Sequence, residues 1–229
     1  CVQSYVGAPF ISVEKVFGFV NLYSNTAGLY DQKTARRLLA FANQASIAIQ
    51  NAQAYKKLEE LATIDSLTGL FVRRHFFELA GKEFTRTLRY HRTLSIIMVD
   101  LDQFKRINDS YGHLVGDQVL RCVAEILIEE KRAMDIIGRY GGEEFVILLP
   151  ETGLLGAKTL AERLCWRIAH IEVENPQGEV HTTASLGVAE LDTSCEQLED
   201  LIDYSDRALY QAKRNGRNRV EVYQADVAW

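Results

Sequence analysis

The feature of this sequence that most restricts its fold is a run of 33 residues, 32–64, that contains neither glycine nor proline. Asp31 precedes the run and is a favourable N-cap residue, so a helix is predicted to begin there. With a rise of 1.5 Å per residue, such a helix is about 50 Å long and exceeds a typical globular helix. It is therefore expected to continue past any single globular domain that packs on it.

Six positions along this helix follow one another at alternating spacings of three and four residues. This is the spacing of the residues that meet in a coiled coil, and two of the six are polar. Two interpretations are open: the helix packs on its own domain, or it pairs with a second copy of the chain as a dimerising signalling helix. The second is favoured because the seam continues past any obvious globular partner. The seam positions are Gln44, Ile47, Asn51, Ala54, Leu58 and Leu61.

Composition narrows the class of protein. The chain of 229 residues is 47% hydrophobic and 25% charged, as in ordinary soluble globular proteins, and its net charge of -5 argues against a nucleic-acid partner. An anionic ligand must then be held by local charge or by metal. The four cysteines are far apart without a C-x-x-C pair, so neither a zinc site nor a disulfide framework is predicted, and a bacterial cytoplasmic location is expected.

No apolar run is long enough to span a bilayer and no signal peptide is visible, so no membrane contact is expected within these residues. The chain begins with Cys1 rather than Met, and we expect it to be part of a larger sensor protein.

The remaining pattern predicts an α/β (α+β) fold, in which helices flank a mixed β-sheet that contains one hairpin. Residues 1–30 are predicted to form strands and turns, since 16–24 is rich in β-branched and aromatic residues. Gly141 and Gly142 form the predicted hairpin turn. Helical periodicity covers 74–91, 116–131, 156–170 and 198–213, and strand-like segments cover 94–102, 135–140, 144–150, 181–190 and 219–223.

Two carboxylates are candidates for a metal site. Asp100 ends an apolar strand, and Glu143 lies at the tip of the glycine hairpin. If the two strands are neighbours, these carboxylates converge into an oxygen-rich site suited to Mg²⁺, which is used in pairs for phosphoryl and nucleotidyl transfer. The alternative is that an acid at a strand end serves only as a cap.

The segment 100–120 contains side chains that a bound nucleotide requires. Backbone amides at Phe104 and Lys105 can donate to phosphate oxygens at the start of a helical turn, and the Lys105 ammonium adds charge. Asn108 and Asp117 can read a base edge, and one carboxylate can accept both N1–H and the 2-amino group of guanine, a pair that adenine lacks. The pattern favours guanine, with Asx turns in a polar loop as the alternative.

Two cations lie near the C-terminus. Lys213 and Arg217 are four residues apart, behind a helix predicted to stop at Gly216. They either neutralise a triphosphate or complement the helix dipole.

Four motifs together resemble the GGDEF family of diguanylate cyclases. DSLTGL, DLDQFKRINDSYGHLVGD, RAMDIIGRYGGEEF and AKRNGRN occur in this order with compatible spacing, within residues 65–223. The resemblance implies a GGDEF fold, related to adenylyl cyclase catalytic domains and polymerase palms. It also implies that two GTP molecules condense to cyclic di-GMP with release of pyrophosphate. Glutamate at the third position of the motif is a frequent variant in the family, so activity is still expected.

The resemblance also implies roles for individual residues. Asp100, Glu143 and the Leu101 carbonyl would hold Mg²⁺ or Mn²⁺, with two ions per site. Glu144 would be a further metal ligand or the base for the 3′-hydroxyl, and Lys105 would assist catalysis. The residues implied to hold GTP are Asn108, His113, Asp117, Phe104, Lys105, Gly141, Gly142, Lys213 and Arg217.

The glycine turn and one departure from the family pattern carry structural expectations. Without Cβ atoms, Gly141 and Gly142 let a nucleotide approach the backbone closely. The family usually has Asn at the position of Val72, and Val72 removes a polar contact near the domain entrance. This places local hydrogen bonding and activation in question, not metal binding.

Arg132 and Asp135 form an R-x-x-D pair upstream of the turn. On the residues alone, an i,i+3 salt bridge at a helix end is the simpler interpretation. The resemblance implies instead an inhibitory product site for cyclic di-GMP, with Arg139 and Arg163 completing it.

The domain organisation follows from these matches. Residues 1–45 resemble the C-terminal part of a GAF sensor domain, 46–64 are the predicted signalling helix, and 65–229 are the predicted cyclase domain. Because each such domain binds one GTP, a homodimer is implied.

The rival hypothesis is a catalytically silent domain that serves as a receptor for GTP or cyclic di-GMP. Such domains lose the acidic turn or the guanine-reading residues, and this chain has both.

Overall fold

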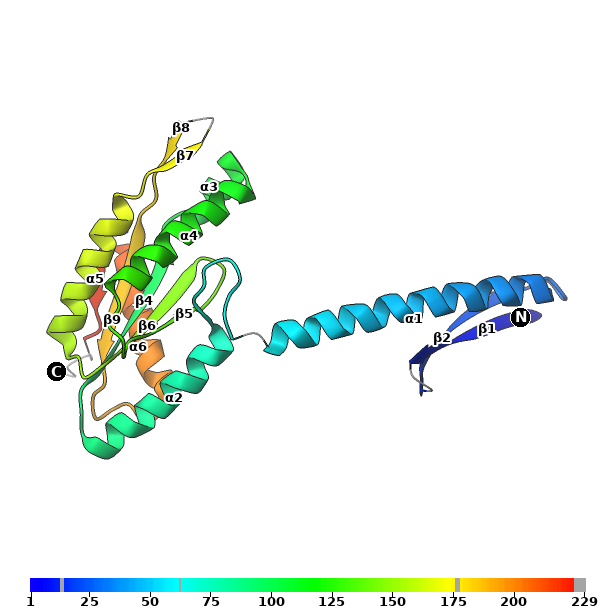
Figure 1. Ribbon diagram of the computed structural model, residues 1–229, viewed down its shortest axis with the longest axis horizontal. Helices are drawn as coiled ribbons and strands as arrows, with labels where there is room; N and C mark the ends of the chain where they lie inside the picture. Colours follow the sequence, from blue (N-terminus) through cyan, green and yellow to red (C-terminus); the bar gives the residue numbers. More distant parts are fainter. Residues whose placement is uncertain (13–14, 62, 176–177, 225–229) are drawn as a thin grey trace. The chain divides into compact units, whose positions relative to one another are not determined.

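The computed structural model describes residues 1–12, 15–61, 63–175 and 178–224, which belong to two compact units, Cys1–Ala62 and Thr63–Trp229 (Figure 1). Among the described residues, no helix combines the length and the apolar character needed to cross a membrane.

The first unit is a hairpin packed on a long helix. Strands β1 (Ser4–Ser12) and β2 (Lys15–Ser24) pair antiparallel, and helix α1 spans Gln32–Leu61. The predicted N-cap is confirmed, since the Asp31 carboxylate accepts a hydrogen bond from the Thr34 amide at 2.7 Å.

One face of α1 covers the hairpin and another bears the seam. Leu38 and Ala42 pack with Ala8 of β1, and Ser46 Oγ accepts from the Ile11 amide. The seam positions Gln44, Ile47, Asn51 and Ala54 are exposed, whereas the side chains of Leu58 and Leu61 lie outside the described part of the chain. Both packing on its own domain and an open seam are therefore compatible with this helix, because they use different faces.

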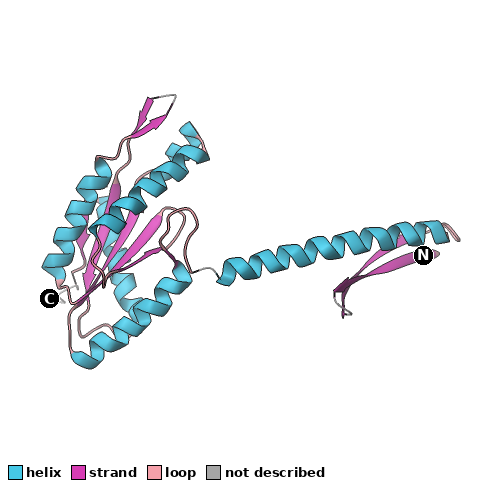
Figure 2. Ribbon diagram, in the orientation of Figure 1, coloured by secondary structure: helices cyan, strands magenta, loops and turns pink. Residues whose placement is uncertain are grey.

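In the described part of the second unit, a six-stranded sheet has the order β10-β9-β4-β6-β5-β3. Figure 2 draws its strands in magenta between cyan helices. Strand β4 lies at the centre, antiparallel to both β6 and β9, and all eight of its residues are buried. The strands are β3 (Phe71–Val72), β4 (Leu94–Leu101), β5 (Ile136–Arg139), β6 (Glu144–Pro150), β9 (Ala184–Glu190) and β10 (Val220–Val222); β7 (Val173–Asn175) and β8 (Gly178–Val180) form a separate hairpin.

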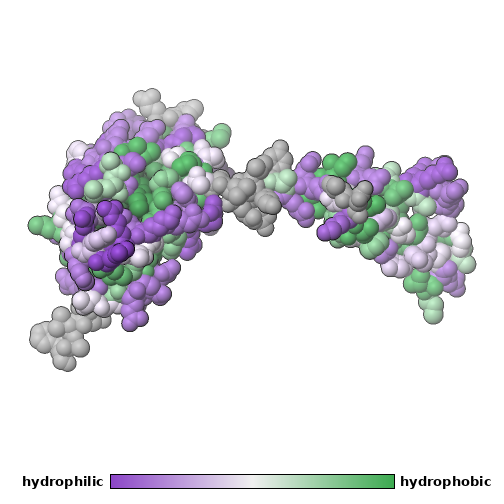
Figure 3. All heavy atoms as spheres, turned by 60° about the horizontal axis from the view of Figure 1, so that its bottom comes forward, coloured by the Kyte–Doolittle hydropathy of each residue, from purple (hydrophilic) through white to green (hydrophobic). Residues whose placement is uncertain are grey.

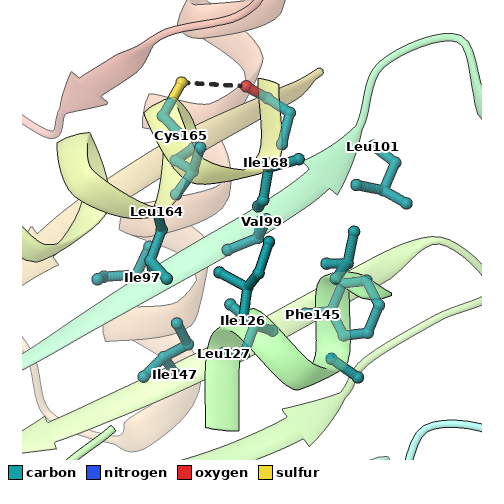
Figure 4. Close-up of a cluster of buried hydrophobic side chains, with 14 of the residues drawn as sticks. Ile97, Val99, Leu101, Ile126, Leu127, Phe145, Ile147, Leu164, Cys165 and Ile168 are labelled. Carbon is teal, nitrogen blue, oxygen red and sulfur yellow. Dashed lines mark hydrogen bonds between the residues drawn. The ribbon is translucent and has the colours of Figure 1, made fainter. Parts of the chain in front are cut away.

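Within the described residues, five helices accompany the sheet, and each face of the sheet has its own apolar core. Ile97 and Val99 of β4 point toward α4 and α5, as Figure 4 shows, whereas Ile96 and Met98 pack with α2 and α6. This alternation follows from the two-residue period of a strand. The helices are α2 (Arg73–Tyr90), α3 (Phe104–Tyr111), α4 (His113–Glu130), α5 (Leu154–Ala169) and α6 (Leu198–Arg214).

The surface between α2 and the start of α6 is hollowed by a groove of about 1020 Å³, lined by apolar side chains such as Phe77 and Leu88. Figure 3 shows apolar side chains gathered within a hydrophilic surface on the forward face of the second unit. Neither Asp100 nor Glu143 lines this groove.

The predicted mixed fold is confirmed, with corrections to its details. The helix expected to start at Gly116 starts at His113, and the strand expected to start at His181 starts at Ala184. Strand β3, the β7–β8 hairpin and α3 as a separate helix were not predicted. Strands of two or three residues are too short to show a period, which explains why the sequence does not reveal them.

Candidate active site

The two candidate metal carboxylates lie at one end of the sheet. Antiparallel pairing of β4 with β6 sets Asp100 opposite Glu144, and the Leu101 amide donates to the Glu143 carbonyl at 3.2 Å. The condition for convergence, that the two strands are neighbours, is therefore met. Asp100 is buried and Glu143 is partly buried.

Both carboxylates are in surroundings that disfavour their charge. Burial raises the pKa of Asp100 above its usual value, and Asp102 and Asp206 add to the rise, although Lys213 opposes it. Burial also raises the pKa of Glu143, followed by repulsion from Asp100, while Lys213 again opposes the rise. A cation beside these carboxylates would favour their charged forms.

The Lys213 ammonium already lies beside one of these carboxylates, since its Nζ is 2.8 Å from the Asp100 carboxylate. The described residues contain no cluster of three or more His, Cys, Asp or Glu side chains that could hold a metal alone. Two carboxylates and a backbone carbonyl fit Mg²⁺ nevertheless, because that ion keeps several waters and is usually bound by one or two carboxylates plus substrate phosphates. The donor set is therefore suitable for a metal that arrives with a nucleotide.

The glycine turn leaves space above one of its residues. A Cβ on Gly142 would meet nothing within 4 Å, and neither turn glycine has positive φ, so the fold itself does not require glycine at that position. A Cβ on Gly141 would lie 2.2 Å from the Glu144 carboxylate, which is the end of a flexible side chain. The open space at Gly142 is compatible with the close approach of a ligand.

Helices α3 and α4 hold the candidate guanine-reading residues. A Cβ on Gly116 would lie 2.0 Å from Asn108 Oδ1 and 3.2 Å from the Phe104 ring, so this glycine permits the contact between the two helices. The side chains of Asn108 and Asp117 form no hydrogen bond with the described residues and are available to a ligand. Gly116 was missed in the sequence because nothing marks a mid-helix glycine as a contact point.

Among the remaining predicted contacts, Phe104 is buried, whereas Lys105 and His113 are exposed. Lys213 and Arg217 have different surroundings. Lys213 pairs with Asp100. Arg217 is exposed and lies in the turn after α6, with a φ of 65°.

Asp102 is a structural carboxylate that sequence reasoning missed. It accepts hydrogen bonds from Thr183 Oγ1 at 2.7 Å, Ser185 Oγ at 2.7 Å and the Asn218 amide at 3.0 Å. These bonds tie the end of β4 to β9 and to the turn after α6 that carries Arg217. The second acid of the D-L-D motif is thus fully used inside the fold.

Arg139 does not line the cavity that holds the other three predicted product-site residues. Its guanidinium bonds to Asp65 at 3.1 Å and to the Gly142 carbonyl at 2.7 Å. The residue ends β5 on the side of the glycine turn, whereas Asp135 precedes the other end of the strand. The pair between Arg139 and Asp65, the first residue of DSLTGL, was not predicted from the sequence.

The other three predicted product-site residues do come together. Arg132, Asp135 and Arg163 line a cavity of about 370 Å³ between α5 and the loop before β5. Asp135 is buried and accepts from the Arg132 amide at 2.7 Å, but its Oδ1 has no partner among the described residues. Burial raises the pKa of Asp135, while the Arg132 backbone hydrogen bond opposes the rise. Among the described contacts, the Asp135 carboxylate is joined to Arg132 through the backbone amide and not through a side-chain salt bridge.

Comparison with known proteins agrees with this geometry. A family model described as "Diguanylate cyclase, GGDEF domain" matches residues 62–219. Diguanylate cyclase A of Treponema denticola is 39% identical over 182 residues, which cover 78% of this chain and 48% of that protein. The chain spans about half or less of the length of the curated relatives it matches.

Solved structures give the same result. The active GGEEF domain of a diguanylate cyclase from Vibrio cholerae aligns with a TM-score of 0.65 and 37% identity, covering 68% of this chain and 98% of that one. The GGDEF domain of DgcB from Caulobacter crescentus, solved in complex with c-di-GMP, aligns with a TM-score of 0.68 and 30% identity, covering 71% and 94%.

Proposed function

Because the chain belongs to the GGDEF family of diguanylate cyclases, we propose that its second unit condenses two GTP molecules into cyclic di-GMP and two pyrophosphates. The convergence of Asp100 and Glu143 beside the open Gly142 turn carries this proposal. An acidic strand end next to a backbone that a phosphate can approach is what nucleotidyl transfer requires.

The roles proposed for the site residues are those that the family resemblance implies, and their positions support them. Asn108 and Asp117 would read guanine with side chains that no described residue occupies, with His113 near the nucleotide. Phosphates would lie at the start of α3, near Phe104 and Lys105.

Asp100, Glu143 and the Leu101 carbonyl would hold two Mg²⁺ or Mn²⁺ ions. The metal, when bound, supplies charge stabilisation for the phosphoryl oxygens. Lys213, which contacts Asp100 at 2.8 Å, would turn to the phosphates once that carboxylate is engaged.

The reaction needs two such domains. The 3′-hydroxyl oxygen of one nucleotide bonds to the α-phosphorus of the other, the bond to pyrophosphate breaks, and the hydroxyl proton passes to Glu144 or to water. Both transfers require two bound nucleotides that face each other, so the chain would act as a homodimer. The exposed seam of α1 supports pairing that keeps two catalytic units at high effective concentration.

Product inhibition is the second part of the proposal. The cavity with Arg132, Asp135 and Arg163 offers guanidinium groups and a buried carboxylate oxygen without a partner. Cyclic di-GMP would supply guanine N–H donors to that oxygen and phosphates to the arginines. Product bound there would hold the domains apart, which is an allosteric effect.

The first unit is proposed to be the C-terminal part of a GAF-like sensor region, on the support of its β-hairpin and following helix.

The decisive experiment incubates the purified chain with GTP and Mg²⁺ and measures cyclic di-GMP by mass spectrometry, with Glu143→Ala as the control. Product from the wild type and none from the control is expected. GTP binding without product at high protein concentration would instead favour the receptor hypothesis.

A further inference from the structure

Two arginines hold the residues that lead into the glycine turn. Arg139, the last residue of β5, bonds to Asp65 and to the Gly142 carbonyl. The next residue, Tyr140, has a different partner, since Arg73 Nη2 donates to the Tyr140 hydroxyl at 3.2 Å. Arg73 is the first residue of α2. The proposed function gives neither Arg73 nor Tyr140 a role.

The contact between Arg73 and Tyr140 is more than one hydrogen bond. The guanidinium carbon of Arg73 lies 4.3 Å from the centroid of the Tyr140 ring and 5.7 Å from that of the Phe77 ring. The two rings are themselves neighbours, with centroids 6.1 Å apart. A guanidinium over an aromatic face is attracted by the negative charge of that face. Arg73 is therefore held against Tyr140 by its charge as well as by its hydrogen bond.

Tyr140 is joined through its backbone to the acidic end of the turn. Its amide donates to the Glu144 carbonyl at 2.8 Å, and the Gly141 amide donates to the same carbonyl at 3.2 Å. These two bonds close the turn that carries Glu143. Because the Tyr140 backbone is part of the closed turn, a restraint on its ring is also a restraint on the turn. Arg73 provides this restraint from α2.

We propose that Arg73 is a positioning residue for the glycine turn, which acts through the Tyr140 ring and keeps Glu143 in the place where a metal is bound. The importance of this place for the reaction rests on the proposed function, whereas the restraint on the turn does not. A site whose ligand is held in position by its supporting residues binds more tightly than one whose ligand must be ordered first. A looser turn would therefore need more Mg²⁺ for the same occupancy.

The first measurement follows hydrogen–deuterium exchange of backbone amides in the whole chain, without nucleotide or metal. Arg73→Gln is expected to speed exchange of the Tyr140 and Gly141 amides by about fivefold or more, because the charge over the ring is lost. The amides of the buried strand β4 report global unfolding and should change less. Arg73→Lys should recover part of the loss, because it returns a positive charge.

Two further variants separate this contact from a general effect on α2. Arg89→Gln is the matched control, since Arg89 also lies on α2 near an aromatic ring, that of Tyr90 at 5.7 Å. It should leave exchange in the turn within about twofold. In a Tyr140→Leu chain, which lacks the ring, Arg73→Gln should have little further effect on the Gly141 amide, because the two residues act as one pair.

The second measurement is the Mg²⁺ concentration that gives half-maximal formation of cyclic di-GMP, which should rise about threefold or more in Arg73→Gln. Turn amides that exchange equally fast in Arg73→Gln and wild type, or in Arg73→Gln and Arg89→Gln, would overturn the inference and leave the proposed function intact. Faster exchange with an unchanged Mg²⁺ requirement would overturn the positioning role. Faster exchange in the variant of a chain that forms no cyclic di-GMP would instead count against the proposed function alone.

Discussion

Arg139 Nη1 lies 3.1 Å from the Asp65 carboxylate, and this pair joins the beginning of the second unit to the glycine turn at Gly141 and Gly142. The same guanidinium donates to the Gly142 carbonyl at 2.7 Å. Burial raises the pKa of Asp65, but hydrogen bonds from Thr68 and the Arg139 charge outweigh burial, and the net pKa is lowered. The DSLTGL motif, through Asp65 and Arg139, thus stabilises the conformation of the glycine turn.

Asp65→Asn is expected to destabilise the second unit by about 1–3 kcal/mol, because it leaves the Arg139 charge without its partner while Arg139 Nε is already buried without one. Cyclase activity should fall as well, since the Gly142 carbonyl loses its fixed donor. Urea unfolding and product formation measure the two effects. Asp203→Asn breaks the exposed Arg207 pair and should change stability by less than about 1 kcal/mol. Equal effects of the two variants would contradict the linkage.

Val72 is the N-cap of α2, and it provides no side-chain hydrogen bond. Val72→Asn restores an acceptor for the first turn and is expected to stabilise the second unit by about 0.5–2 kcal/mol. Val72→Ala is the matched control, because it shortens the side chain without capping the helix. The midpoint of urea unfolding compares the two. An asparagine variant no more stable than the alanine variant would show that the missing cap does not matter.

The central elements of the fold and the main carboxylates could be predicted from the sequence because their signals are local. Strand β4 is a continuous apolar run that ends in Asp100, and the glycine turn places Glu143 near it once β4 and β6 pair. The pairing of β4 with β6 therefore brings the two motifs together in space.

The other contacts could not be predicted, because they depend on tertiary register. Arg139 is four residues beyond Asp135, and the sequence alone groups it with the product site; the strand between them carries it to Asp65 instead. Asp102 likewise depends on donors that lie more than 80 residues away.

The raised pKa of Glu143 gives a pH dependence with a definite sign. A carboxyl whose folded pKa exceeds its unfolded pKa destabilises the fold at high pH, and this penalty disappears as pH falls through the folded pKa toward 4.5. Glu143→Gln removes the charge, so it should be more stable than wild type at pH 8 and equal to it near pH 4. Thermal unfolding across this range measures the difference. A gap that widens as pH falls would contradict the assignment.

Arg163 and Arg167 share one acidic partner, but only Arg163 lines the cavity proposed to bind cyclic di-GMP. Glu130 pairs with both Arg163 at 2.5 Å and Arg167 at 3.0 Å, but only Arg163 lines the cavity with Arg132. Arg132→Ala and Arg163→Ala are expected to weaken cyclic di-GMP binding by about tenfold or more, since each removes a charge-assisted contact. Arg167→Ala should leave it within about twofold. If added cyclic di-GMP still inhibits the Arg132→Ala variant, the proposed product site is wrong.

The exposed seam of α1 predicts self-association through Ile47, whose surface is 60% exposed although the residue is strongly apolar. Ile47→Glu places a charge in the seam and should shift the chain from dimer toward monomer, because apolar burial between seam residues is lost and two like charges meet. Ala48→Glu adds the same charge one position along, at an exposed site outside the seam, and should leave the dimer intact. Sedimentation at several concentrations separates the two. If wild type is already monomeric at high concentration, or if both variants dissociate equally, pairing does not run through this seam, and the two catalytic units must meet by another surface.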